Sequence, residues 1–170
     1  MGIVWISVPA HDQAKRFNAV AAARTLETAA WVLPVAGSAP GVFTLDATGT
    51  GPAAVVNQDG SLNSATNPAA RGSVISIYAT GEGRTSPAGA TGSVTQSNTK
   101  TPLLPVTVKI GGIGATVQYA GSAPDEVAGL LQVNAVVPQG VGTGAAVPVT
   151  VSVGGIASRA GVTIAVKQAD

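Results

Sequence analysis

Residues 147–156 read VPVTVSVGGI, and the fold class follows from this stretch. Valine occupies every second position from 147 to 153, and Pro148, Thr150 and Ser152 stand between the valines. Successive side chains of a strand point to opposite faces, so the alternation predicts a strand with one face in a core and the other in water. Gly154 and Gly155 then predict a tight hairpin, because both central positions of a type I′ turn need positive φ.

The same pattern occurs earlier in the chain. Residues 106–113 read VTVKIGGI, which again places alternate branched residues before a Gly-Gly pair. Asp59-Gly60 predicts another type I′ hairpin, between Val55-Val56 and Leu62. The sequence GSAP stands at both 37–40 and 121–124. These matching contexts indicate a degenerate internal repeat, with residues 101–167 as a sub-repeat.

The amino-acid composition indicates that the rest of the chain is also built from strands. The 22 glycines and 11 prolines interrupt long helices, while Val, Ile and Thr favour extended backbone. Short apolar runs with turn residues between them predict an all-β, immunoglobulin-like antiparallel β-sandwich. We expect strands at 31–36, 41–45, 53–57, 73–80, 105–110, 116–120, 128–137, 147–153 and 162–166. Residues 81–102 are rich in Gly, Ser, Thr and Pro and are predicted to form a long surface loop.

Residues 1–30 form an atypical N-terminal segment before a domain at 31–167. The Ala-rich stretch 12–30 favours a short helix that Asp12 could cap, and a strand at 17–23 fits almost as well. The opening MGIVWI is too short for a signal or a membrane span, so any export signal lies outside these 170 residues.

Charge and cysteine content exclude several function classes. Charged residues make up 10% of the chain and the net charge is +1, so no basic field exists for nucleic acid or an anionic membrane. We expect neither nucleic-acid binding nor membrane insertion. The absence of cysteine rules out disulfides and thiolate metal sites.

A series of motifs in fixed order gives the chain a family resemblance. They are APGVFT at 39–44, VNQDGSLN at 56–63, NPAARGS at 67–73, YATGEG at 78–83, YAGSAP at 119–124, QVN at 132–134 and GVTIAV at 161–166. Residues 31–167 thereby resemble the uncharacterised C-terminal domain family abundant in Solibacter and related acidobacteria. The resemblance implies a module of large extracellular proteins, without an assigned activity. Residues 101–166 are also similar to immunoglobulin-like modules of surface receptors and transcription factors.

An oxygen-rich loop is the candidate metal site. Asn57, Asp59 and Asn63 present side-chain oxygens at alternating positions, and Ca²⁺ prefers such hard ligands. The loop has one carboxylate, which Asp46 or the Asp125-Glu126 pair could supplement, so binding would be weak. The alternative is a plain hairpin stabilised by Asx turns. No other cofactor is expected.

Catalysis lacks a recognisable centre in this sequence. His11 is the sole histidine, and the chain has no Gly-x-Ser-x-Gly or His-Glu-x-x-His motif. We expect a non-catalytic extracellular or cell-surface module with a structural, adhesive or binding role toward a protein or polysaccharide. The alternative is a small calcium-assisted hydrolase of a lactone or ester, which would use the oxygen-rich loop with Asp46 or Glu126. An exposed edge strand could also pair with a second copy.

Other polar residues have structural interpretations beside functional ones. Glu82 and Arg71 flank the strand at 73–80 and could form an ion pair at its ends. Lys109 could enter a Lys-Asn crosslink only if buried, and its alternation places it on the polar face.

The few aromatic residues allow two uses. Tyr78, Tyr119 and Trp31 could form a platform for a sugar ring, but with so few aromatic residues in the chain, core packing is favoured.

Overall fold

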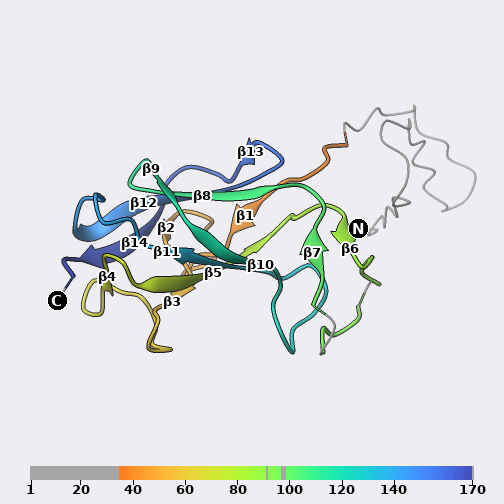
Figure 1. The fold of residues 1–170 in the computed structure, drawn as a ribbon, viewed down its shortest axis with the longest axis horizontal. Coiled ribbons are helices and arrows are strands. Elements are labelled where there is room, and N and C mark those ends of the chain that lie inside the picture. The colour runs from red at the N-terminus through yellow and green to blue at the C-terminus, as the bar shows by residue number, and fades with distance from the viewer. Residues whose placement is uncertain (1–34, 91, 97–98, 170) are drawn as a thin grey trace, which may run out of the picture. The chain divides into compact units, whose positions relative to one another are not determined.

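The computed structural model describes residues 35–90, 92–96 and 99–169 (Figure 1). Residues 1–37 and 38–170 form two separate units, and every described strand lies in the second unit. The predicted helix at 12–30, His11 and Trp31 lie outside the described residues. The strand expected at 31–36 is not formed at Val35 and Ala36, its two described positions.

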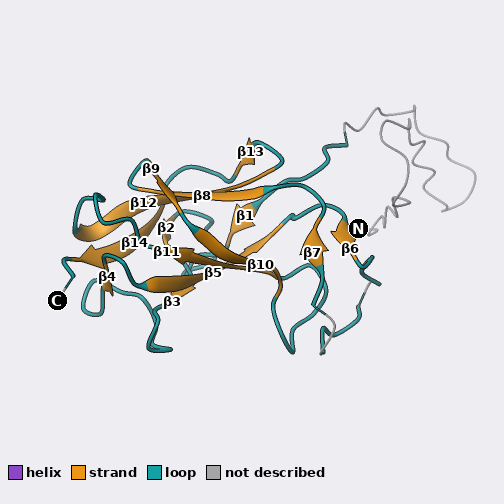
Figure 2. Ribbon diagram, viewed as in Figure 1, coloured by secondary structure: helices purple, strands orange, loops and turns teal. Residues whose placement is uncertain are grey.

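All regular structure in the described part of the chain is strand, which confirms the all-β prediction (Figure 2). Five strands form the first sheet, in the order β1-β5-β11-β10 with β3 also pairing β5. Their bounds are β1 Gly41–Val42, β3 Val55–Val56, β5 Val74–Thr80, β10 Val117–Ser122 and β11 Leu131–Val136. All pairings within this sheet are antiparallel.

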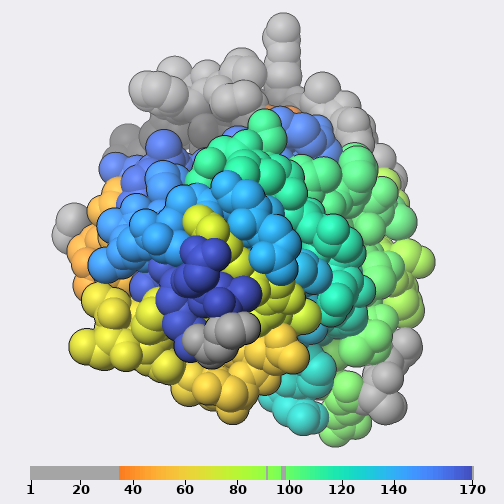
Figure 3. All heavy atoms as spheres, turned by 60° about the vertical axis from the view of Figure 1, so that its left-hand side comes forward, coloured from red at the N-terminus to blue at the C-terminus, as the bar shows by residue number. Residues whose placement is uncertain are grey.

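Seven strands form the second sheet, in the order β2-β14-β12-β8-β9, with β13 pairing β12 and β4 pairing β14. Their bounds are β2 Gly51–Pro52, β4 Ala69–Ala70, β8 Val106–Ile110, β9 Ile113–Ala115, β12 Gly144–Val153, β13 Ile156–Ala157 and β14 Val162–Lys167. The two short strands β2 and β4 pair with β14 in parallel, at successive positions along one edge. The space-filling view shows the yellow segment that includes β4 beside the dark-blue C-terminal strand (Figure 3).

The core confirms the alternation that the sequence shows. Val147, Val149, Val151 and Val153 of β12 are all buried, and Pro148 between them is exposed. One cluster of buried apolar side chains includes residues from both sheets, among them Ile75, Ile77, Leu131 and Val133 from the first and Val108, Ile110, Val149, Val151 and Ile164 from the second. The described unit is therefore a β-sandwich with an aliphatic core. Its immunoglobulin-like topology stays a prediction.

The Gly-Gly hairpins form as predicted. Gly111 and Gly112 have φ of 57° and 81°, and Gly154 and Gly155 have φ of 59° and 82°. Each pair joins directly partnered residues, Ile110 with Ile113 and Val153 with Ile156. Positive φ at both central positions is the requirement of a type I′ turn. The hairpins β8-β9 and β12-β13 are thus closed in the same way.

The hairpin at Asp59-Gly60 exists, but its predicted type is wrong. Of the two residues only Gly60 has positive φ, 83°. The Gly60 N–H donates to the Asn57 carbonyl at 2.9 Å, and the Asn57 N–H donates to the Ser61 carbonyl at 2.8 Å. The loop therefore has three residues and ends on a left-handed glycine, a geometry in which Asp59 keeps ordinary backbone angles.

The segment 81–102 is more ordered than a surface loop. It contains the antiparallel pair β6 (Thr85–Ser86) and β7 (Thr101–Pro102). An isolated bridge also joins Val94 to Val127. Across the described ranges, no helix is long and apolar enough to cross a bilayer.

Candidate functional site

Asn63, one of the three predicted calcium ligands, binds the backbone of β14. Its Nδ2 donates to the Ala165 carbonyl at 2.9 Å, and its Oδ1 accepts from the Ala165 N–H at 2.8 Å. Asn63 is only 3% exposed. A side-chain carboxamide has the same donor and acceptor as a peptide group, so Asn63 pairs with β14 as a strand residue would.

The position of Ala165 along β14 explains why the side chain of Asn63 pairs with it. Along one edge of β14, the carbonyls of Gly161 and Thr163 accept from Gly51 and Ala53, and the carbonyl of Lys167 accepts from Arg71. Ala165 falls in the gap between β2 and β4 on that edge. The side chain of Asn63 fills this gap, which leaves the backbone groups of β14 paired.

Asn57 and Asp59 also make hydrogen bonds within the hairpin. The Asn57 Oδ1 accepts from Asn63 Nδ2 at 3.0 Å, and its Nδ2 donates to the Asn67 carbonyl at 3.0 Å. The Asp59 carboxylate accepts from the backbone N–H of Ser61 at 3.0 Å and from the Ser61 hydroxyl. These two bonds hold the pKa of the exposed Asp59 carboxyl below its ordinary value, with the hydroxyl as the largest cause.

The structure thus brings Asn57 and Asn63 together as hydrogen-bond partners. Both amide oxygens accept hydrogen bonds, and the loop contributes one exposed carboxylate. Asp46 lies in a separate turn, where its Oδ1 accepts from the N–H and hydroxyl of Thr48. Among the residues that the structure describes, no group of three or more His, Cys, Asp and Glu side chains could hold a metal.

We therefore expect calcium to leave the stability of this loop unchanged. Thermal unfolding in excess CaCl₂ and in excess EDTA should give the same melting temperature, because the amide oxygens are already engaged. A rise in melting temperature with calcium that disappears in Asp59→Ala would contradict this expectation and support the predicted calcium site.

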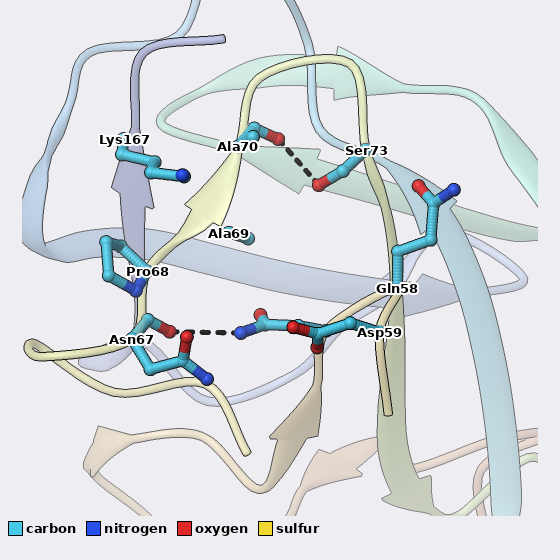
Figure 4. Close-up of a pocket in the computed structure, with 9 residues that line it drawn as sticks. Gln58, Asp59, Asn67, Pro68, Ala69, Ala70, Ser73 and Lys167 are labelled. Atoms are coloured by element: carbon cyan, nitrogen blue, oxygen red, sulfur yellow. Dashed lines mark hydrogen bonds between the residues drawn. The ribbon is translucent and has the colours of Figure 1, made fainter. Parts of the chain in front are cut away.

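A pocket of about 470 Å³ lies beside this hairpin (Figure 4). Its lining comprises Asn57, Gln58, Asp59, Asn67, Pro68, Ala69, Ala70, Ser73 and Lys167. Figure 4 shows Lys167 entering from β14 and Asp59 from the hairpin. The Lys167 charge is a small further cause of the lowered pKa of Asp59. The side chains of Asn57, Asp59 and Asn67 bond mainly to the hairpin itself, which favours a structural role for this network.

A second pocket lies on the outer face of the five-stranded sheet. It has a volume of about 350 Å³ and is lined by Phe43, Ala54, Tyr78, Ala123, Pro124, Glu126, Leu130 and Gln132. We call it the outer-face groove. Tyr78 and Gln132 stand directly opposite each other on β5 and β11, and the Phe43 N–H donates to the Tyr78 carbonyl at 3.0 Å. Phe43, Tyr78 and Gln132 therefore form a row across three neighbouring segments of the sheet.

Tyr78 and Tyr119 do not pack in the core, the use that the sequence favours for them. Ile75, Ile77 and Ala79 of β5 are buried, so Tyr78 points to the opposite, outer face. Tyr119 on β10 donates its hydroxyl to the Ser122 carbonyl at 2.7 Å and lies against Gly121. Partial burial raises the pKa of Tyr119. The prediction that these two tyrosines pack in the core is therefore wrong, because aliphatic residues fill the core.

The predicted ion pair between Arg71 and Glu82 is also wrong. Arg71 donates to the Gln168 side chain at 2.9 Å, and Glu82 Oε2 is buried without a hydrogen-bond partner. The seven residues of β5 separate the two, a length of more than about 20 Å. Residues that flank a strand lie at its opposite ends, and this distance excludes the pair.

Lys109 is exposed, as its alternation predicts, and its cross-strand neighbours are Thr150 and Gly114. Neither neighbour carries a carboxamide, so β8 does not bring together the partners of a Lys-Asn crosslink.

Glu82 is the most deeply buried carboxyl in the described part of the chain, at 6% exposed. Burial raises its pKa, and the charge of Lys100 partly offsets this. A raised folded-state pKa means that the folded chain binds this proton more tightly than the unfolded chain does. The resulting stability is present below the ordinary pKa and is lost as pH rises through the folded-state pKa.

We expect Glu82→Gln to be more stable than the parent protein at neutral pH, by on the order of 1 kcal/mol, because it removes a buried charge. The difference should shrink as the pH is lowered, since the parent carboxyl then becomes neutral. Urea unfolding of both proteins across mildly acidic to neutral pH measures this. Glu126→Gln, at an exposed position, is the matched control, and equal pH profiles for all three proteins would disprove the assignment.

The fold and the two pockets define an all-β sandwich with a polar hairpin network and an aromatic groove. Comparison with known proteins adds no relative: no family model, curated protein or solved structure matches this chain.

Proposed function

We propose that this chain is a non-catalytic β-sandwich module that binds a surface protein or polysaccharide outside the cell. The outer-face groove carries the proposal. It places two aromatic side chains, Phe43 and Tyr78, in a row on the outer face of the sheet, and Phe43 is 43% exposed. A folded protein that leaves an aromatic side chain in a groove beside polar groups has the features of a binding site.

The composition of the groove supports binding without catalysis. Its lining contains one carboxylate, Glu126, and no histidine, serine or second acid. Hydrolysis of an ester or lactone needs a nucleophile together with a base or a metal-bound water. The lining supplies at most one of these groups.

The resemblance of residues 31–167 to Solibacter-type domains supports the extracellular placement. In the family, such domains stand at the ends of large exported proteins, where a rigid sandwich would present a binding surface. The edge strand β9 offers a pairing site for a second copy of the chain. Light scattering of the purified chain would detect such a dimer.

Two assays test the proposal together. The full chain should be retained on immobilised polysaccharides or surface proteins, and it should show no turnover of ester or lactone substrates with calcium or with EDTA. Turnover that is abolished by EDTA and by Asp59→Ala would overturn the proposal in favour of a calcium-assisted hydrolase. Retention that is unchanged in Phe43→Ala would remove the groove as its basis.

A further inference from the structure

Several residues that line the outer-face groove lie at one level of the sheet. Antiparallel pairing sets Tyr78 directly opposite Gln132, and Gln132 directly opposite Gly121. Neighbouring strands lie about 4.8 Å apart, so these positions form a straight row. Ala54, Ala123, Pro124 and Leu130 add apolar surface to the lining. A ligand ring can therefore rest on Phe43 and Tyr78.

The polar groups of the groove have unused hydrogen-bonding capacity. Gln132 Nε2 donates to Asn134 Oδ1 at 2.9 Å, which fixes the amide plane and leaves Oε1 as an acceptor. Within the described ranges, the Tyr78 hydroxyl and the Glu126 carboxylate make no hydrogen bond to the protein. The lining thus combines two acceptors and one phenol with apolar side chains, a composition that suits a ligand with apolar faces and a rim of hydroxyl donors.

The charge of the groove narrows the ligand class. Glu126 is the only charged residue of the lining, so an anionic ligand would meet a like charge and no compensating cation. The sheet backbone below is paired on both sides of β5, by β11 on one edge and by β1 and β3 on the other. An extended peptide therefore cannot add a strand here, which removes the main source of affinity for peptides on sheets.

We propose that the outer-face groove binds a neutral saccharide, with one sugar ring stacked on Phe43 and Tyr78 and its hydroxyls bonded to Gln132 and Glu126. The inference rests on the proposed binding function and names the ligand class of the same site. Stacking uses the apolar C–H face of the sugar against the aromatic rings, and the carboxylate and amide acceptors take the hydroxyl protons.

The test is titration of the full chain with soluble neutral glucans and mannans, followed by affinity electrophoresis, with a uronic-acid polymer as the anionic comparison. We expect binding of a neutral polymer and none of the anionic one. Tyr78→Ala and Phe43→Ala should each weaken this binding about tenfold, an effect typical of a lost aromatic contact. Tyr78→Phe keeps the ring and should retain most of the affinity.

Leu103→Ala is the matched control, because Leu103 is 55% exposed and lies outside the groove. Unchanged circular dichroism of every variant separates lost binding from lost fold. Binding of neutral polymers that Tyr78→Ala leaves intact would overturn the inference. Binding of proteins alone, sensitive to Phe43→Ala, would also overturn it while leaving the non-catalytic binding function in place.

Discussion

Asn63→Leu should lower the free energy of unfolding by on the order of 3 kcal/mol or more. Leucine keeps most of the side-chain volume but removes the amide that pairs with both backbone groups of Ala165. Those two groups and Asn57 Oδ1 then lose their partners, and all three lie among buried residues. Each buried polar group left unpaired costs about 1–3 kcal/mol. Urea unfolding with fluorescence detection measures the loss.

Asn63→Asp refines this expectation, because aspartate keeps the acceptor and loses the donor. It can still accept from the Ala165 N–H, but it places a carboxylate beside the Ala165 carbonyl and Asn57 Oδ1. We expect it to be at least as destabilising as leucine at neutral pH and to recover part of the loss in acid.

Asn67→Leu is the matched control for Asn63. Asn67 also donates two side-chain hydrogen bonds, to the Ser61 hydroxyl and the Leu62 carbonyl, but it is only half-buried. Water can replace its bonds, so we expect a loss of about 1 kcal/mol. Equal losses at positions 63 and 67 would show that the carboxamide of Asn63 does not act as a strand residue.

Gly81→Ala should be more damaging than the same substitution at Gly112 or Gly114. Gly81 has φ of 78°, and a Cβ there would overlap the carbonyl oxygen of Ala39. The same residue accepts a hydrogen bond from the Ala39 N–H at 2.9 Å, so the two segments cannot separate without losing it. The left-handed backbone alone costs about 1–2 kcal/mol for alanine, and the overlap with backbone adds to this. Thermal unfolding measures the total.

Substitutions at two further glycines separate the cost of the left-handed backbone from the cost of the overlap with Ala39. Gly112 has φ of 81° with nothing within 4 Å of an added Cβ, so Gly112→Ala reports the backbone cost alone. Gly114 has neither a left-handed backbone nor a neighbour within 4 Å, and Gly114→Ala should be close to neutral. If Gly81→Ala is no worse than Gly112→Ala, the close approach of Ala39 is not part of the stable fold.

The strands of the core could be predicted because their signal is local. The alternate valines of 147–153 and the Gly-Gly pairs fix strand faces and turns within a few residues of each other. β2 and β4 could not be predicted as parts of one sheet, since each has two residues and its partner β14 lies about a hundred positions away. The sequence of such short strands carries no periodicity.

The candidate sites could likewise be predicted only where their residues are close together in the sequence. The oxygens of Asn57, Asp59 and Asn63 were visible in the sequence, but the main partner of Asn63 is the backbone of Ala165, 102 residues later. The outer-face groove had a partial signal, because the buried alternation of Ile75 and Ile77 puts Tyr78 on the polar face. Its row with Phe43 and Gln132 depends on the register of three segments, which only the folded chain defines.

The place of β14 in its sheet has a consequence for synthesis. This strand comes last in the sequence, yet it lies inside the seven-stranded sheet, between β12 and the early strands β2 and β4. Residues 51–52 and 69–70 therefore gain their partner in the sheet only after β14 has emerged from the ribosome. We expect a chain truncated before Val162 to remain sensitive to protease along its whole length, because the missing strand borders both halves of the sheet.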